Sequence, residues 1–212
     1  MITSYQIKKI FSIFSANNPN PETELKFSSA YECLVAVILS AQATDIGVNK
    51  ATDHLFKVAN TPEAMVTLGE MGLQEKIKTI GLYRSKASHI IKMSHMLIDL
   101  HHSKVPNTRE ALQALPGVGR KTANVVLNVV FAEPTLAVDT HIFRVSHRLG
   151  FSAGKTPGAV EKDLLKIIPK RYLYHAHHWL ILHGRYICKA RNPMCESCPV
   201  SRYCLFKKNE SK

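Results

Sequence analysis

The sequence predicts an all-α protein, and three observations support this fold class. Apolar residues recur at helical spacing along most of the chain, as they do in the segment 7–14. Helix-start signals also recur: Thr61-Pro62 and Thr156-Pro157 each place a capping residue before a proline in the first turn. The one strand-like stretch, 125–130, has no hairpin partner nearby and also fits a helical stripe. The composition, 45% hydrophobic and 21% charged, is that of a folded globular chain.

The helices can be placed in order along the chain. An amphipathic helix over 7–14 explains the N-terminal apolar residues better than a signal peptide does. The segment 29–32, Ser-Ala-Tyr-Glu, is a capping-box pattern and opens a strongly apolar helix that runs to about residue 41. The segment 107–110, Asn-Thr-Arg-Glu, repeats the capping pattern. Gly81 and Gly150 each follow an apolar-periodic stretch, which predicts that they end helices.

The charge of the chain is strongly positive and unevenly distributed. Lys and Arg number 28 against 16 Asp and Glu, which gives a formal charge of +12 and a pI near 9.6. Residues 1–106 hold 11 basic and 9 acidic residues, whereas residues 107–212 hold 17 and 7. This balance indicates a polyanionic partner. The longest apolar run, 33–39, cannot span a bilayer, and no basic amphipathic helix carries a broad aromatic face, so nucleic acid is favoured over a membrane.

A glycine-rich turn between two apolar helices is the first functional signal. Residues 115–123 read Leu-Pro-Gly-Val-Gly-Arg-Lys-Thr-Ala, in which Pro116 ends one helix and Gly117 and Gly119 permit a tight turn with positive φ. A second helix is expected to begin near Arg120, so that backbone N–H groups lie beside a helix N-terminus and can bind a phosphate oxygen. An ordinary helix–turn–helix corner is the alternative, and the local positive charge favours phosphate binding.

Two further residues could carry chemistry. Lys121 follows Arg120 at the positive end of the second helix, a position that disfavours its charged form, and an uncharged lysine can attack a sugar carbon to form an imine. On residue type alone, Lys121 could equally well bind a phosphate through its positive charge. Asp139 precedes the helical stripe of 142–149 and is expected near an N-cap, where a structural capping role is the default interpretation.

Four of the five cysteines form a compact pattern. Cys188, Cys195, Cys198 and Cys204 have the spacing C-x6-C-x2-C-x5-C, which suits a [4Fe–4S] cluster or a structural zinc ion. The cluster is favoured, because zinc sites more often use two close cysteine pairs and only one is present. Disulfides fit poorly with an odd cysteine count and the reducing cytosol expected for this chain. Cys33, in the most apolar helix, is expected to be an inert core thiol.

The segment 115–123 resembles the helix–hairpin–helix signature of DNA repair glycosylases, and the chain from about 17 to 204 is similar to the endonuclease III family. These enzymes are glycosylases and AP lyases for oxidised pyrimidines. The resemblance implies two helical lobes with a DNA cleft. One lobe is a six-helix barrel over 22–133, with the hairpin near 108–131. The other is an iron–sulfur lobe of 1–21 and 134–212, with the cluster loop at 188–204.

The resemblance also assigns roles to residues. Lys121 corresponds to the nucleophile and Asp139 to the catalytic carboxylate, which we expect to stabilise positive charge at the sugar C1′. Gln42 is expected to meet the orphaned base and Leu82 to wedge into the stack, while Asp45 and His141 shape the lesion pocket. The four cysteines hold a [4Fe–4S] cluster. The expected DNA-binding residues are Gln42, Leu82, Leu115, Gly117, Val118, Gly119, Arg120, Arg144, Arg185, Lys189 and Arg191.

The expected partner is duplex DNA that contains an oxidised pyrimidine or an abasic site, bound by a monomer in the cytoplasm of a bacterium, at the nucleoid. Related glycosylases that remove mispaired adenine or cut pyrimidine dimers are one alternative, although the adenine enzymes usually lack a lysine at position 121. A non-enzymatic hairpin module is another. His175 and His178 share a helical face, which suggests a metal site, but solvent-facing or hydrogen-bonded histidines are the favoured interpretation of these two and of His177.

Overall fold

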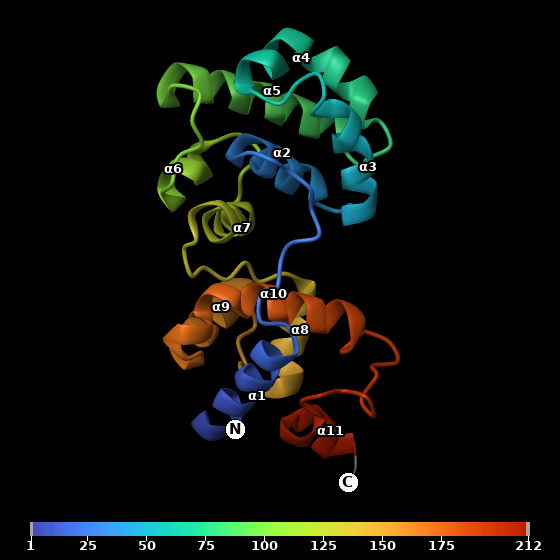
Figure 1. Ribbon diagram of the computed structural model, residues 1–212, viewed down its shortest axis with the longest axis vertical. Coiled ribbons are helices and arrows are strands. Elements are labelled where there is room, and N and C mark those ends of the chain that lie inside the picture. The colour runs from blue at the N-terminus through green and yellow to red at the C-terminus, as the bar shows by residue number, and fades with distance from the viewer. Residues whose placement is uncertain (1, 211–212) are drawn as a thin grey trace. The chain divides into compact units, whose positions relative to one another are not determined.

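The computed structural model describes residues 2–210, and it is built of α-helices with no strand in that range (Figure 1). The predicted all-α class is confirmed. Contacts divide the chain into two units, residues 23–132 and residues 1–22 with 133–212. We call them the central unit and the terminal unit. Within the described residues, no helix combines the length and apolarity that a membrane span requires.

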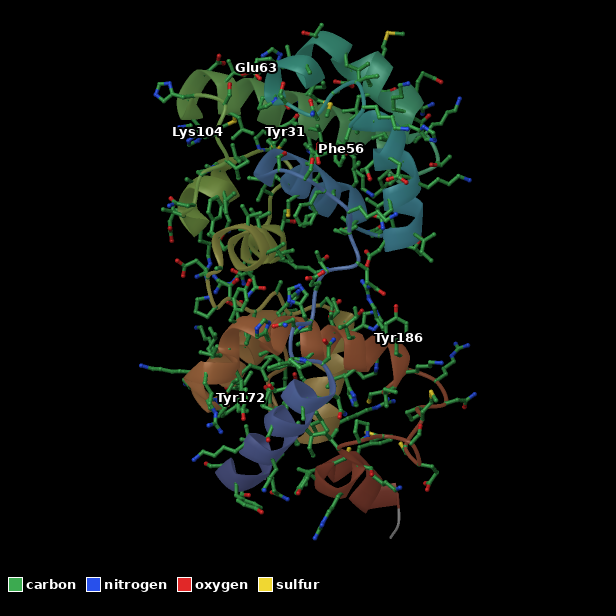
Figure 2. All side chains as sticks on the ribbon, in the orientation of Figure 1. Tyr31, Phe56, Glu63, Lys104, Tyr172 and Tyr186 are labelled. Atoms are coloured by element: carbon green, nitrogen blue, oxygen red, sulfur yellow. The ribbon has the colours of Figure 1, made fainter. Side chains whose placement is uncertain are left out.

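The central unit is arranged around one buried helix. That helix, α2, is apolar on all sides, with nine of its residues buried, and it contacts α3, α5 and α7 (Figure 1). Its Tyr31 hydroxyl points toward α5 and lies 2.6 Å from the Ser94 hydroxyl (Figure 2). The helices of this unit are α2 (Ala30–Ser40), α3 (Asp45–Leu55), α4 (Pro62–Ile77), α5 (Tyr83–His101), α6 (Arg109–Ala114) and α7 (Arg120–Phe131).

The helix starts follow the predicted caps with two corrections. Ser29 caps α2 as expected, but the Glu32 carboxylate accepts bonds from the Ser28 amide and hydroxyl instead of completing the reciprocal bond to Ser29. The second cap is Thr108 rather than Asn107, because its hydroxyl accepts the Ala111 amide. Pro62 and Pro157 both lie in first helical turns, as predicted.

The helix ends show which glycines use positive φ. Gly150 ends α8 with a φ of 82°, as predicted. The prediction for Gly81 is wrong, because α4 already ends at Ile77 and Gly81 lies in the following turn. Gly69, which carried no sequence signal, interrupts α4 with a φ of 73°.

The terminal unit joins the first helix to the last third of the chain. Phe11 of α1 stacks on Phe151 and Tyr172 at centroid distances of 5.7 and 6.0 Å, and the Trp179 indole donates to the Asn18 carbonyl at 2.8 Å. Helix α1 therefore packs beside α10 (Figure 1). The helices are α1 (Ser4–Asn17), α8 (Thr140–Leu149), α9 (Pro157–Ile167), α10 (Lys170–Tyr186), the short 3₁₀ helix η1 (Ser201–Tyr203) and α11 (Leu205–Glu210).

Candidate functional site

The hairpin between α6 and α7 is a tight turn built from Leu115 to Val118. The Val118 amide donates to the Leu115 carbonyl at 3.1 Å, with Pro116 and Gly117 at the two central positions of a type II turn. Gly117 has a φ of 79°, and a Cβ there would lie 3.0 Å from the His89 Cβ. Gly119 instead has extended backbone with a φ of −86° as the N-cap of α7. The expectation of positive φ at both glycines is therefore wrong for Gly119.

The hairpin anchors its apolar side chains and exposes its backbone. Leu115 and Val118 are only 2% and 6% exposed and pack into the core of the central unit, so their side chains are not available to a ligand. Gly117 and Gly119 are exposed, and within the described residues no acceptor is recorded for their N–H groups. A Cβ added to Gly119 would meet no atom within 4 Å. The turn therefore presents amide donors to solvent beside the positive end of α7.

The two residues expected to carry the chemistry lie in different units. Lys121 is exposed on the first turn of α7 in the central unit, next to the exposed Arg120. The sequence led us to expect that Lys121 is partly removed from water, but in the folded chain its side chain is exposed. Asp139, in the terminal unit, is the N-cap of α8, and its Oδ1 accepts the Ile142 amide at 2.8 Å. The predicted N-cap position is confirmed, and the Ile142 amide orients this carboxylate.

Gln42 and Leu82 lie on two adjoining turns of the central unit. Both residues adopt the left-handed backbone conformation, with φ of 57° and 59°, which costs about 1–2 kcal/mol for a residue other than glycine. Both are exposed, Leu82 by 61%. The turns line one pocket, in which Gln42 and Thr44 face Thr79 and Gly81. The structure therefore brings two distant motifs together and holds both in strained turns, a feature that occurs often at functional sites.

The remaining residues expected at the DNA have varied surroundings. Asp45 is half-buried in the first turn of α3, and His141 is half-buried on α8 in the other unit. Lys189 and Arg191 are exposed, and Arg185 is half-buried. Arg144 is occupied within the chain, because its guanidinium donates to the carbonyls of Cys188 and Gly184 at 3.0 and 2.8 Å and lies 3.3 Å from the His141 ring. These bonds give Arg144 a role in holding α10 and the cysteine loop against α8.

The four clustered cysteines line one pocket in the terminal unit. None of them forms a disulfide. Burial raises the pKa of the Cys198 thiol, and the three neighbouring thiols raise it further. His183 also lines the pocket, with its Nε2 3.9 Å from Cys198 Sγ. Four free cysteines around one pocket suit the four thiolate ligands of an iron–sulfur cluster.

Arg148 is a residue of this region that the sequence did not single out. Its guanidinium donates to the carbonyls of Lys189 and Ala190 at 2.6 and 3.1 Å and to Cys188 Sγ at 3.4 Å, and it lies 4.6 Å from the centre of the Phe206 ring. It therefore fastens the start of the cysteine loop to α8. No local signal marks such a residue, because its partners follow it by about forty positions.

The histidines of α10 are structural in character. His177 and His178 are buried, which contradicts a solvent-facing position, and His175 is half-buried. Burial lowers the pKa of His178 to about 4, and the neighbouring His175 adds to this effect. In the part of the chain that the structure describes, no group of three His, Cys, Asp or Glu side chains is arranged to hold a single metal ion. Cys33 is fully buried as expected, and burial raises its pKa to about 12.

Comparison with known proteins gives consistent similarities. The model of the HhH-GPD superfamily of base excision DNA repair proteins matches residues 35–170, and that of the iron–sulfur binding domain of endonuclease III matches residues 188–204. Endonuclease III of Rickettsia conorii is 60% identical, over 93% of this chain and 94% of its own length; that of Escherichia coli K12 is 57% identical, over 94% of each. A solved endonuclease III trapped as a covalent intermediate with DNA aligns with a TM-score of 0.93 at 45% identity, over the whole of both chains.

Proposed function

This chain belongs to the endonuclease III family of base excision repair enzymes, and from that premise we propose that it excises oxidised pyrimidines such as thymine glycol from duplex DNA. It is a bifunctional DNA glycosylase and AP lyase with the iron–sulfur binding domain of that family. The hairpin is the observation that supports the roles proposed for individual residues. It exposes amide donors at Gly117 and Gly119, and the amine of Lys121 follows within the next turn. Backbone binding and a nucleophile are thereby joined in one short segment.

We propose Lys121 as the nucleophile that displaces the base, and the imine that it forms then promotes cleavage of the strand. After losing a proton, its Nζ attacks the sugar C1′, and the base leaves with the electron pair of the glycosidic bond and takes up a proton. The bond between C1′ and the ring oxygen O4′ then breaks: O4′ leaves with the electron pair and takes up a proton, while the lone pair of Nζ forms the double bond of a protonated imine. Removal of a proton from C2′ then expels the 3′ phosphate by β-elimination. The strand is cut 3′ to the abasic site.

Asp139 is proposed to stabilise the positive charge that develops at C1′ as the base leaves. Its carboxylate already accepts the Ile142 amide, which holds the anion in a fixed orientation. A role in moving protons during imine formation is secondary. Replacement by asparagine should therefore slow base release more than it weakens DNA binding.

Gln42 and Leu82 are proposed to open the duplex. A damaged nucleotide must leave the stack before its C1′ can be attacked, which costs a few kcal/mol. Leu82 is 61% exposed on a fixed turn and can wedge between bases, while Gln42 offers an amide that can pair with the orphaned base. Asp45 and His141 are proposed to shape the pocket for the extruded base.

The cysteine pocket is proposed to hold a [4Fe–4S] cluster with a structural role. Each of Cys188, Cys195, Cys198 and Cys204 supplies one thiolate, and the bound cluster supplies rigidity to a loop that has little secondary structure of its own. The exposed Lys189 and Arg191 of this loop can then contact phosphates at defined positions. We propose that the enzyme acts as a monomer on the DNA of the bacterial nucleoid.

Borohydride trapping tests this function. The unaltered protein, mixed with thymine-glycol DNA, is expected to form a reducible covalent adduct, and Lys121→Ala is expected to form none while still binding DNA. Lys104→Ala, which removes another exposed lysine of the central unit (Figure 2), is the matched control and should trap normally. An adduct that survives in Lys121→Ala would contradict the assigned nucleophile, and the absence of any adduct in the unaltered protein would contradict the reaction.

A further inference from the structure

Lys86 is a buried cation that none of the steps above uses. It lies on the first turn of α5 and is only 5% exposed. Its ammonium donates to the carbonyls of Leu39 and Ala41 at 2.9 and 2.6 Å, and no described carboxylate lies within ion-pair distance of it. Burial lowers its pKa. The partial negative charge at the C-terminal end of α2 stabilises the cation in place of a counter-ion.

The bond to Ala41 acts directly on Gln42. The Ala41 carbonyl and the Gln42 amide belong to one planar peptide group, so a bond that orients this carbonyl also sets the rotation about the adjoining N–Cα bond of Gln42. Gln42 has the unfavourable φ of 57°. Lys86 therefore holds the peptide group next to Gln42 in an orientation that the chain does not favour by itself.

The same residue also acts on Leu82. The Lys86 amide donates to the Leu82 carbonyl at 3.0 Å, which is the first helical bond of α5. Leu82 is the residue before that helix and has a φ of 59°, with no side-chain cap. The two turns adjoin, because a Cβ added to Gly81 would lie 3.8 Å from the Gln42 carbonyl oxygen. One residue thus contacts the backbone on both sides of the pocket that Gln42 and Gly81 line.

We propose that Lys86 is a positioning residue that locks the two strained turns together, so that Gln42 and Leu82 enter the DNA stack as one rigid unit. This inference rests on the proposed function of these two side chains. The reason for a charged residue at a buried position is then that an ammonium can donate to both carbonyls at once. An apolar side chain of equal size would fill the space and keep the backbone bond to the Leu82 carbonyl, but it would leave the turn at Gln42 free to relax against the turn at Leu82.

The first experiment compares Lys86→Met with Ser94→Ala, both tested as cluster-loaded full-length protein. Ser94 lies on the same helix, is fully buried and bonds to Tyr31 and to the Ile90 carbonyl, so its loss perturbs the same core away from the two turns. In Lys86→Met, single-turnover excision of thymine glycol is expected to fall by about 10- to 100-fold. Cleavage of a preformed abasic site, which has no base to unstack, should fall far less. Ser94→Ala should change both rates equally.

A spectroscopic readout follows the opening of the duplex. The fluorescent base 2-aminopurine is placed opposite the lesion. Binding of the unaltered protein is expected to increase the fluorescence of 2-aminopurine, because this orphaned base loses its stacking on the neighbouring bases. Lys86→Met should bind the duplex and give little of this increase. A full fluorescence increase in Lys86→Met would overturn the inference.

The decisive experiment is a mutant cycle. If Lys86 acts through the two turns, then Lys86→Met should add no more than about a twofold loss of excision in a protein that already carries Gln42→Ala and Leu82→Ala. A further loss as large as in the unaltered background would overturn the inference. Should Lys86→Met fail to fold, Lys86→Leu, which also removes the donors to the two carbonyls, enters the same cycle with the same criterion. Failure of the proposed function would be distinct, because the unaltered protein would then excise nothing.

Discussion

The two glycines of the hairpin should respond in opposite ways to replacement by alanine. Gly117 has positive φ and a Cβ there would lie 3.0 Å from the His89 Cβ, whereas Gly119 has extended backbone and open space where its Cβ would point. The chain itself therefore requires glycine at 117 and not at 119. We therefore expect Gly119 to serve a ligand that approaches the backbone, which we take to be a DNA phosphate.

The magnitudes follow from these environments. Gly117→Ala should lose about 1–2 kcal/mol from the left-handed backbone, before any cost of displacing His89. For a chain of this size that corresponds to a fall in Tm of about 2–8 °C. In Gly119→Ala, a less flexible unfolded chain stabilises the fold and a poorer N-cap destabilises it, so stability should stay within about 0.5 kcal/mol. Loss of one bond to a charged phosphate should weaken DNA binding by roughly 10- to 100-fold.

Two measurements separate these effects. Thermal melting followed by circular dichroism should show a lower Tm for Gly117→Ala only. Titration of an uncleavable abasic-site analogue at several salt concentrations should show weaker binding for Gly119→Ala at each of them, with a salt dependence close to that of the unaltered protein, because an uncharged amide neutralises no phosphate. If Gly119→Ala melts early, or binds DNA with the affinity of the unaltered protein, the reasoning about the hairpin is refuted.

Two further predictions concern the terminal unit. Arg148→Met should lose the visible absorbance of its cluster to a chelator at least about tenfold faster than the unaltered protein, because the bonds to the Lys189 and Ala190 carbonyls are lost. Arg202→Met, at an exposed arginine of the same loop, is the control, and equal rates for both variants would count against this role. The pKa of His178 in the folded protein, about 4, lies below its ordinary value of 6.5. As the pH falls, the unfolded chain therefore binds a proton at this residue before the folded protein does. Up to about 3 kcal/mol of stability should be lost between about pH 6.5 and pH 4. Urea unfolding of His178→Gln should show a smaller loss over that range, and an unchanged loss would argue against a neutral buried His178.

Several features could be read from the sequence because they depend on neighbouring residues. A cap hydroxyl bonds an amide three positions later, and proline followed by glycine sets a type II turn within four residues. Such short-range rules identified the hairpin, the N-cap at Asp139 and the cysteine loop, and the resemblance added their roles. The same rules failed by one residue at Thr108, where two adjacent polar residues could each have capped the helix.

The sequence by itself determined that this chain is helical, binds DNA through a hairpin and carries an iron–sulfur loop. Only the tertiary structure decided that α1 packs against α10, that Arg148 fastens the cysteine loop, and that Lys86 connects the end of α2 to the start of α5. Nor did any local signal predict left-handed backbone at Gln42 and Leu82, because neither residue type favours that conformation. These contacts join residues some forty or more positions apart, and their formation depends on how helices pack rather than on the pattern within any one helix.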